Sequence, residues 1–238
     1  EPKRLVETTD RFAGVICGNE TTAIAYDNWF DTRNVNTYLF NPSDAKQQPQ
    51  IINSRNSQDV YSDPGNYETR KNQFGRDVLL VDNDNLFQIG DGFTPKGQFP
   101  FIDQFSLKTL KSSRIYQSAL TDKLERIISI MDVKKGEIFV QLQSKTEYPN
   151  YFIRNLKKKI APLAITQFPN PFESIKDVEK TLIKYKRKDG VDLSGTLYLP
   201  AGYDKAKIEK LPLLIWAYPA EYKDKNSAGQ TSANPNEF

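Results

Sequence analysis

Short apolar runs, separated by turns rich in Asn, Asp, Gly, Pro and Ser, fill the chain from its start to about residue 165. No long segment repeats its apolar residues with the period of 3.6 that marks an amphipathic helix. Because the runs are short and bounded by turn residues, the pattern predicts β-strands throughout this part of the chain.

The predicted strands form three groups of four. Each group consists of a strand, a tight turn, a strand, a longer connection, a strand, a polar turn and a strand, and the groups recur about every 45–65 residues. This spacing is typical of β-propeller blades stretched by insertions, although a plain β-sandwich also fits the pattern. The predicted strands are 13–17, 22–26, 37–41 and 50–53; 78–82, 86–89, 101–107 and 114–117; and 126–131, 138–144, 151–155 and 161–166.

The segment 53–76 interrupts this rhythm. It contains Asp63-Pro64-Gly65, where Pro fixes φ and Gly accepts a positive φ. We interpret the segment as a loop between two blades.

The character of the chain changes after residues 168–172, where two prolines block a helix. Asp189-Gly190 between two alternating runs predicts a hairpin that pairs 180–186 with 195–199. Residues 211–217 are nearly all apolar, as expected of a strand covered by helices on both faces, and 222–238 are polar and loop-like. We therefore predict propeller blades over 1–168, and a linker with the first strands of an α/β domain over 169–238.

The composition excludes several kinds of catalytic and metal site. The chain has 33 Lys and Arg, 30 Asp and Glu, and no His, so it holds neither a Ser-His-Asp triad nor a His-containing zinc site. Cys17, the single cysteine, is interpreted as a buried strand residue. The net charge of +3 is too small to indicate nucleic-acid binding, no apolar run is long enough to span a membrane, and no signal peptide is expected from the first residues. No cofactor or metal is predicted.

The chain resembles serine peptidases of the prolyl oligopeptidase family in the hairpin, in Leu197-Tyr198-Leu199-Pro200-Ala201-Gly202-Tyr203, and in 211–222. Trp216-Ala217-Tyr218-Pro219 and 92–97 are similar to the glutamyl endopeptidase or dipeptidyl-aminopeptidase-like branch. The resemblance implies the last blades of a propeller and the start of an α/β-hydrolase domain. The fold class expected is thus mostly β, with about three four-stranded blades.

The resemblance implies acyl-enzyme chemistry on peptide substrates, with the propeller controlling access. In this family a Tyr just past the first apolar hydrolase strand donates its O–H to the oxyanion, which corresponds to Tyr218 here, with Tyr222 as the fallback. No G-x-S-x-G nucleophile motif is present, so the chain alone is expected to be inactive. Cleavage after Glu would need a cation, for which four arginines in or near predicted loops are candidates: Arg33, Arg55, Arg70 and Arg76.

A non-catalytic binding or scaffold module of propeller type is the alternative, since it would explain the missing His and Ser motif. The open edges of a partial propeller also predict self-association. Members of this branch include exported and organellar proteins, so a periplasmic or otherwise exported location is expected rather than a cytoplasmic one.

Overall fold

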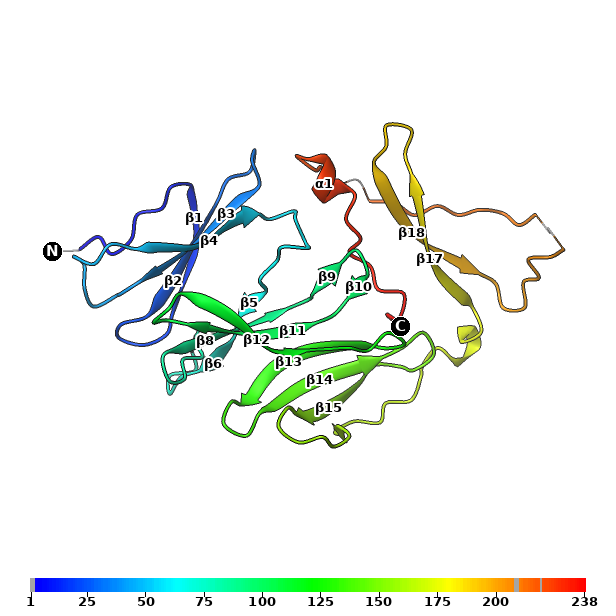
Figure 1. The fold of residues 1–238 in the computed structure, drawn as a ribbon. Helices are drawn as coiled ribbons and strands as arrows, with labels where there is room; N and C mark the ends of the chain where they lie inside the picture. The colour runs from blue at the N-terminus through cyan, green and yellow to red at the C-terminus, as the bar shows by residue number, and fades with distance from the viewer. Residues whose placement is uncertain (1–2, 208–209, 219) are drawn as a thin grey trace.

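Three four-stranded antiparallel sheets dominate the fold in the computed structural model, which describes residues 3–207, 210–218 and 220–238 (Figure 1). The first sheet contains β1 (Arg11–Cys17), β2 (Ala23–Asn28), β3 (Asn34–Phe40) and β4 (Gln50–Asn56). The second contains β5 (Asn66–Tyr67), β8 (Asn85–Gly90), β11 (Phe101–Ser106) and β12 (Lys111–Gln117). The third contains β13 (Leu124–Asp132), β14 (Glu137–Gln143), β15 (Asn150–Asn155) and β16 (Leu163–Ala164).

Smaller elements are inserted into the second sheet or follow the third. Two hairpins interrupt the second sheet: β6 (Thr69–Lys71) with β7 (Asp77–Leu79), and β9 (Phe93–Thr94) with β10 (Gly97–Gln98). After the third sheet come a 3₁₀ turn, η1 (Glu173–Ile175), the hairpin of β17 (Glu179–Lys186) and β18 (Asp192–Leu199), and the one-turn helix α1 (Lys225–Ala228). No helix among the described residues is long and apolar enough to cross a membrane.

The three sheets are consecutive blades that pack face to face, as blades of a propeller do. One cluster joins Ile24 of the first sheet to Leu86 and Phe105 of the second. A second cluster joins Ile102 of the second sheet to Val140 and its neighbours in the third. Alternation along each strand sends side chains to both faces, so the middle blade contributes to both clusters. The predicted fold class is confirmed.

Buried carboxylates hold the strands of these blades together. Asp27 is fully buried, and its carboxylate accepts hydrogen bonds from the Asp10 N–H (2.8 Å), the Tyr38 hydroxyl (2.7 Å), and the Asn36 N–H (3.2 Å) and side-chain amide (2.9 Å). Burial alone would raise the pKa of Asp27, but these hydrogen bonds outweigh it and lower that pKa. Asp27 thereby ties the segment before β1 to the centre of the first blade.

A second buried carboxylate links the second and third blades. Glu125 of β13 is almost fully buried and lies 2.6 Å from both the Tyr116 hydroxyl of β12 and the Arg154 guanidinium of β15. Burial, followed by the hydrogen bond to Glu125, raises the pKa of Tyr116, so the phenol stays protonated and donates.

The second blade corrects part of the sequence prediction. Its first strand is β5, which lies inside the predicted loop 53–76, whereas 77–79 pair with β6 in an inserted hairpin rather than with β8. Gly65 makes this possible: its φ is +81°, and a Cβ there would collide with the backbone of Ile89. Strand β5 has only two residues and forms because the backbone at Gly65 lies close to Ile89. Its sequence therefore shows no alternating pattern from which a strand could be predicted. Cys17 does lie in a strand, but it is exposed because β1 is the edge of its sheet.

The hairpin predicted around Asp189-Gly190 is confirmed. Strands β17 and β18 pair in register from Glu179 with Leu199 to Lys186 with Asp192, and Gly190 has a φ of +85°. By contrast, the strand predicted for 211–217 is not formed, since these residues hydrogen-bond to no strand in the structure. Side chains of this segment are exposed, Leu214 by 87% and Trp216 by 81%. An apolar run forms a strand only when a neighbouring strand accepts and donates hydrogen bonds to its backbone N–H and C=O groups.

Candidate functional site

One end of the three blades carries the loops that bind the C-terminal segment. These loops are 29–33, 57–65, 91–100, 118–123 and 144–149, and we call their common surface the docking face. Residues 220–238, coloured red in Figure 1, run across this surface from the first blade to the third. The docking face brings together the two predicted parts of the chain and is therefore the candidate functional site.

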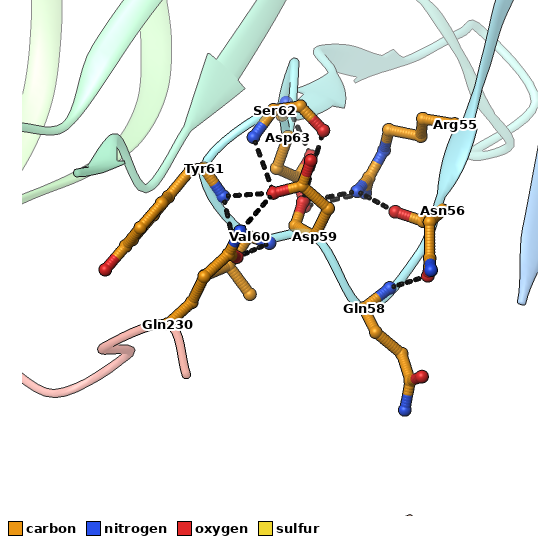
Figure 2. Close-up of polar contacts among 10 residues, drawn as sticks. Arg55, Asn56, Gln58, Asp59, Val60, Tyr61, Ser62, Asp63 and Gln230 are labelled. Atoms are coloured by element: carbon orange, nitrogen blue, oxygen red, sulfur yellow. Dashed lines mark hydrogen bonds and ion pairs between the residues drawn. The ribbon is translucent and has the colours of Figure 1, made fainter. Parts of the chain in front are cut away.

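The loop 57–65 recognises Gln230 through both ends of its side-chain amide (Figure 2). The Gln230 carbonyl oxygen accepts from the Val60 N–H at 2.8 Å, and its amide nitrogen donates to the Asp59 carboxylate at 2.7 Å. That carboxylate also accepts from the N–H groups of Tyr61 (3.1 Å) and Ser62 (3.3 Å). Burial would raise the pKa of Asp59, but the hydrogen bonds, from Gln230 first, lower it. Asp59 is therefore an ionised anchor.

Arg55 holds this loop in shape and is not free to bind a substrate. Its guanidinium donates to the backbone oxygens of Asn56 and Asp59, each at 3.1 Å, and pairs with the Asp63 carboxylate at 2.8 Å. These contacts occupy the guanidinium on the inner side of the loop, as Figure 2 shows. The candidate role of Arg55 as a partner for an acidic side chain therefore gives way to a structural one.

Helix α1 is attached to the same loop. Asp224 caps the helix by accepting from the Ser227 N–H at 2.8 Å, and its second oxygen accepts from the Asn56 side-chain amide at 3.0 Å. The hydrogen bond from the Ser227 N–H is the main cause that lowers the pKa of Asp224. Just before the helix, Gln58 donates to the carbonyl oxygen of Glu221 at 2.5 Å and accepts from the Lys223 N–H at 3.0 Å.

The end of the chain continues across the second and third blades. Asn234 donates to Gln98 at 3.2 Å, Glu237 pairs with Arg126, and the Phe238 N–H donates to Gln143 at 2.8 Å. The Phe238 ring packs edge-on against Tyr148, with ring centroids 5.2 Å apart. The segment is thus bound to all three blades rather than to one.

Tyr218 lies at the end of the exposed apolar run, three residues before Glu221. Its ring is 83% exposed and packs against Trp216, with ring centroids 6.0 Å apart. Tyr222 is also exposed, though less so. The role expected of Tyr218 stays a prediction, and Pro219, which belongs to the motif around it, lies outside the described residues.

The four candidate arginines fall in three different environments. Arg33 lies in loop 29–33 of the docking face and pairs with Glu221 at 3.5 Å. Arg70 and Arg76 are exposed on the β6–β7 hairpin, which lies far from the C-terminal segment in Figure 1. Only Arg33 therefore combines a place on the docking face with a guanidinium that the loop itself does not fully use. Within residues 3–207, 210–218 and 220–238, no group of three or more His, Cys, Asp or Glu side chains is arranged to hold a metal ion.

Comparison with known proteins identifies the relatives of this chain. It is 36% identical over its whole length to a protein named probable glutamyl endopeptidase, chloroplastic, from Oryza sativa subsp. japonica. The chain is thus similar to a protein named glutamyl endopeptidase. A protein of the same name from Arabidopsis thaliana is also 36% identical over the whole chain. These matches confirm the resemblance to glutamyl endopeptidases.

The chain spans about a quarter of the length of these relatives, 27% and 26%. No protein-family model matches it. Among solved structures, oligopeptidase B from Trypanosoma brucei with covalently bound antipain aligns with 82% of this chain and 33% of its own, at a TM-score of 0.45 and 10% identity.

Sequence reasoning missed the docking of the C-terminal segment. Gln230 and Asp59 are separated by 171 positions, and both belong to polar stretches whose default place is the solvent. The only local signal was the density of Asn, Asp and Gln in 222–238, which suits a loop as well as a docked segment.

Proposed function

We propose that the protein acts as a serine peptidase that cleaves peptides through an acyl-enzyme. The observation that carries the proposal is the 36% identity, along the entire chain, to proteins named glutamyl endopeptidase. The chain has no His and no G-x-S-x-G motif, so the nucleophile and its base would come from residues beyond these 238. The 238 residues alone are then inactive, and peptide hydrolysis by the purified chain would contradict this.

In this mechanism Tyr218 is the oxyanion donor. A phenol O–H aimed at the tetrahedral intermediate stabilises charge that develops only in the transition state. Its exposure here leaves the hydroxyl available to such a group, and the anchored segment that follows it holds its backbone near the docking face.

The test is Tyr218→Phe in the enzyme that carries the nucleophile. Loss of one oxyanion donor should lower kcat by about 10²–10³ while KM changes little, because the donor acts on the transition state. Tyr222→Phe tests the fallback candidate and should keep its rate if Tyr218 is the donor. Equal kcat values for wild type and Tyr218→Phe would remove Tyr218 from the mechanism.

The propeller would limit access to the active site. Blades that surround a channel admit extended peptides and exclude folded proteins. The expected result is rapid cleavage of a short peptide and no cleavage of the same sequence placed in a rigid loop of a folded protein. Similar rates on both substrates would contradict gating.

Two further properties follow from the proposal. The edge strand β1 exposes Phe12 and Val15, so the chain alone would self-associate through this edge, and Val15→Lys should shift its sedimentation toward the monomer.

An exported or organellar location is supported by the relatives, both of which are named chloroplastic. Peptides would be the partners of the enzyme, and nothing in its charge favours nucleic acid.

A further inference from the structure

A cavity of about 300 Å³ opens between the third blade and the β17–β18 hairpin. Its lining comes from the loop 144–149 of the third blade, from residues 170–178 of the linker, from the hairpin, and from the end of the docked C-terminal segment. A volume of this size is at the lower end of the range for small-molecule sites. Among the described residues that line the cavity, none belongs to 211–222, so the cavity is distinct from the site expected at Tyr218.

Aromatic side chains make up much of this lining. The rings of Tyr148, Phe172 and Phe238 form a cluster with centroids 5.2, 6.2 and 6.5 Å apart. Two of these rings, Phe172 and Phe238, line the cavity together with Tyr198 of β18. Phe172 is 49% exposed and Tyr198 is 60% exposed. An apolar group that enters the cavity would therefore remove aromatic surface from water and could pack against ring faces or edges.

Local hydrogen bonds fix the backbone that carries Phe172. The Asn170 side chain accepts from the Phe172 N–H at 2.8 Å. Two residues earlier, the Phe168 N–H donates to the Asn150 side chain of β15 at 2.6 Å, which attaches the linker to the third blade. The aromatic wall is thus formed without a ligand, and a ligand would not have to order it.

The charge of the cavity has one sign. Of the described residues that line it, none is acidic and three are lysines: Lys145, Lys176 and Lys180. Lys180 and Tyr198 are directly opposite in the hairpin register, so their side chains lie on the same face. The Lys180 ammonium donates to the backbone oxygen of Glu237 at 2.6 Å and lies 5.8 Å from the centre of the Tyr198 ring. An ammonium has three donors, so this contact leaves Lys180 able to meet an anion.

The carboxylates around the cavity are already paired. Glu173 pairs with Lys176 at 3.1 Å, and both of these side chains are more than half exposed. Glu179, at the start of β17, pairs with Lys205 at 2.5 Å. An incoming anion would therefore meet lysines at the cavity without an acidic side chain in the lining to repel it.

We propose that this cavity binds a small arylalkyl carboxylate, whose ring packs against Phe172, Tyr198 and Phe238 and whose carboxylate pairs with the lysines. The volume suits one ring with a short chain rather than a folded partner. The proposal goes beyond the proposed peptidase function and does not depend on it. Because the lining joins the third blade to the hairpin and to the docked segment, a bound ligand would stabilise this arrangement of the two parts of the chain.

The test is isothermal titration calorimetry on the full-length protein with three probes: 4-phenylbutyrate, 4-phenylbutanol and acetate. We expect 4-phenylbutyrate to bind. The alcohol, which lacks the charge, should bind about tenfold more weakly, and acetate, which lacks the ring, should give no measurable heat.

Variants locate the site. Tyr198→Ala should weaken the binding of 4-phenylbutyrate about tenfold, and Phe172→Ala, on a separate segment, should do the same even if the hairpin variant fails to fold. Lys145→Gln combined with Lys176→Gln should weaken the acid about fivefold and leave the alcohol within about twofold of wild type. Tyr185→Ala is the matched control, since Tyr185 is an exposed tyrosine of the same hairpin that does not line the cavity.

Three outcomes would overturn the proposal. The first is the absence of binding by 4-phenylbutyrate, and the second is an affinity that both Tyr198→Ala and Phe172→Ala leave unchanged. The third is an alcohol that binds as tightly as the acid, because the lysines would then have no role. Tighter binding of the tripeptide Ala-Ala-Phe with a free carboxylate than of 4-phenylbutyrate would assign the cavity to peptide C-termini and overturn the small-molecule assignment. None of these measurements uses peptidase activity, so their failure would leave the proposed function intact.

Discussion

Replacement of Asp27 by Asn removes one charge and almost no volume from the centre of the first blade. The native carboxylate is fully buried and accepts four hydrogen bonds, two at each oxygen. An amide keeps one acceptor oxygen, so whichever way it turns, its NH₂ group faces two of the four former donors. Steric effects are minimal, so the loss should report on the lost charge and its hydrogen bonds and not on packing.

The size of the loss depends on which donors lose their partner. If the amide oxygen faces Asn36, the donors left are the Asp10 N–H and the Tyr38 hydroxyl. Tyr38 retains Thr9 as an acceptor at 3.1 Å, whereas the Asp10 N–H then faces the NH₂ group of the new amide. A buried donor left unsatisfied costs about 1–3 kcal/mol, so the free energy of unfolding should fall by about 1–3 kcal/mol.

Urea unfolding followed by tryptophan fluorescence measures this loss, with the exposed Asp122→Asn as the matched control. Hydrogen exchange should locate it, since the amide protons of Asp10 and Asn36 donate directly to Asp27. A loss below about 1 kcal/mol, or one no larger than that of the control, would refute the reasoning. Faster exchange spread evenly over all three blades would refute the local explanation.

The same residue predicts a pH dependence. The pKa of Asp27 is lowered in the folded state, so its stabilising effect is fully present above the unfolded pKa of about 3.9. That effect is lost as the pH falls through the lower folded value, when the carboxylate is protonated. The stability gap between wild type and Asp27→Asn should therefore be constant above about pH 5 and narrow below about pH 4. A gap that widens on acidification would contradict the lowered pKa.

Two other substitutions test the backbone and the blade contacts. Gly92→Ala would place a Cβ against the carbonyl of Phe99 at a φ of +65°, whereas Gly75→Ala, at +72°, meets open space. Unfolding in urea should show a loss of about 1–2 kcal/mol for Gly75→Ala and at least twice that for Gly92→Ala, and equal losses would contradict the clash. Glu125→Gln should cost about 2–3 kcal/mol, less than a fully buried pair because Arg154 reaches solvent. Adding Arg154→Met should recover part of that loss in the same assay, and a purely additive double variant would contradict the coupling.

The sequence predicted the blades well where the pattern is local. Alternating runs bounded by turn residues located three of the four strands in the second blade and all of those in the first and third. The hairpin around Asp189-Gly190 was equally clear, because a positive φ at Gly190 is a property of the turn itself. Strand β5 was not predicted because its pairing with β8 depends on the close approach of the Gly65 backbone to Ile89, which lies 24 positions further along the chain.

The candidate site was far less predictable. Tyr218 came from a family resemblance and not from any physical feature of its surroundings. Polar residues such as Gln230 acquire their importance from tertiary contacts, and the same letters describe a solvated loop. Among the four arginines considered, composition offered no way to separate Arg33 from Arg55, since their difference is in how many donors their own loop consumes.

The apolar segment before Tyr218 connects the fold to the proposed function. Leu213, Leu214, Ile215 and Trp216 are each more than three quarters exposed, although 220–238 just beyond them are bound to all three blades. Burying four such side chains is worth about 1.5–3 kcal/mol each, so about 6–12 kcal/mol of stabilisation is unrealised in this arrangement. A contiguous exposed apolar stretch of this kind marks a surface that another element covers. If the peptidase proposal holds, the covering element belongs to the domain that supplies the nucleophile, and the docking face fixes that domain relative to the propeller.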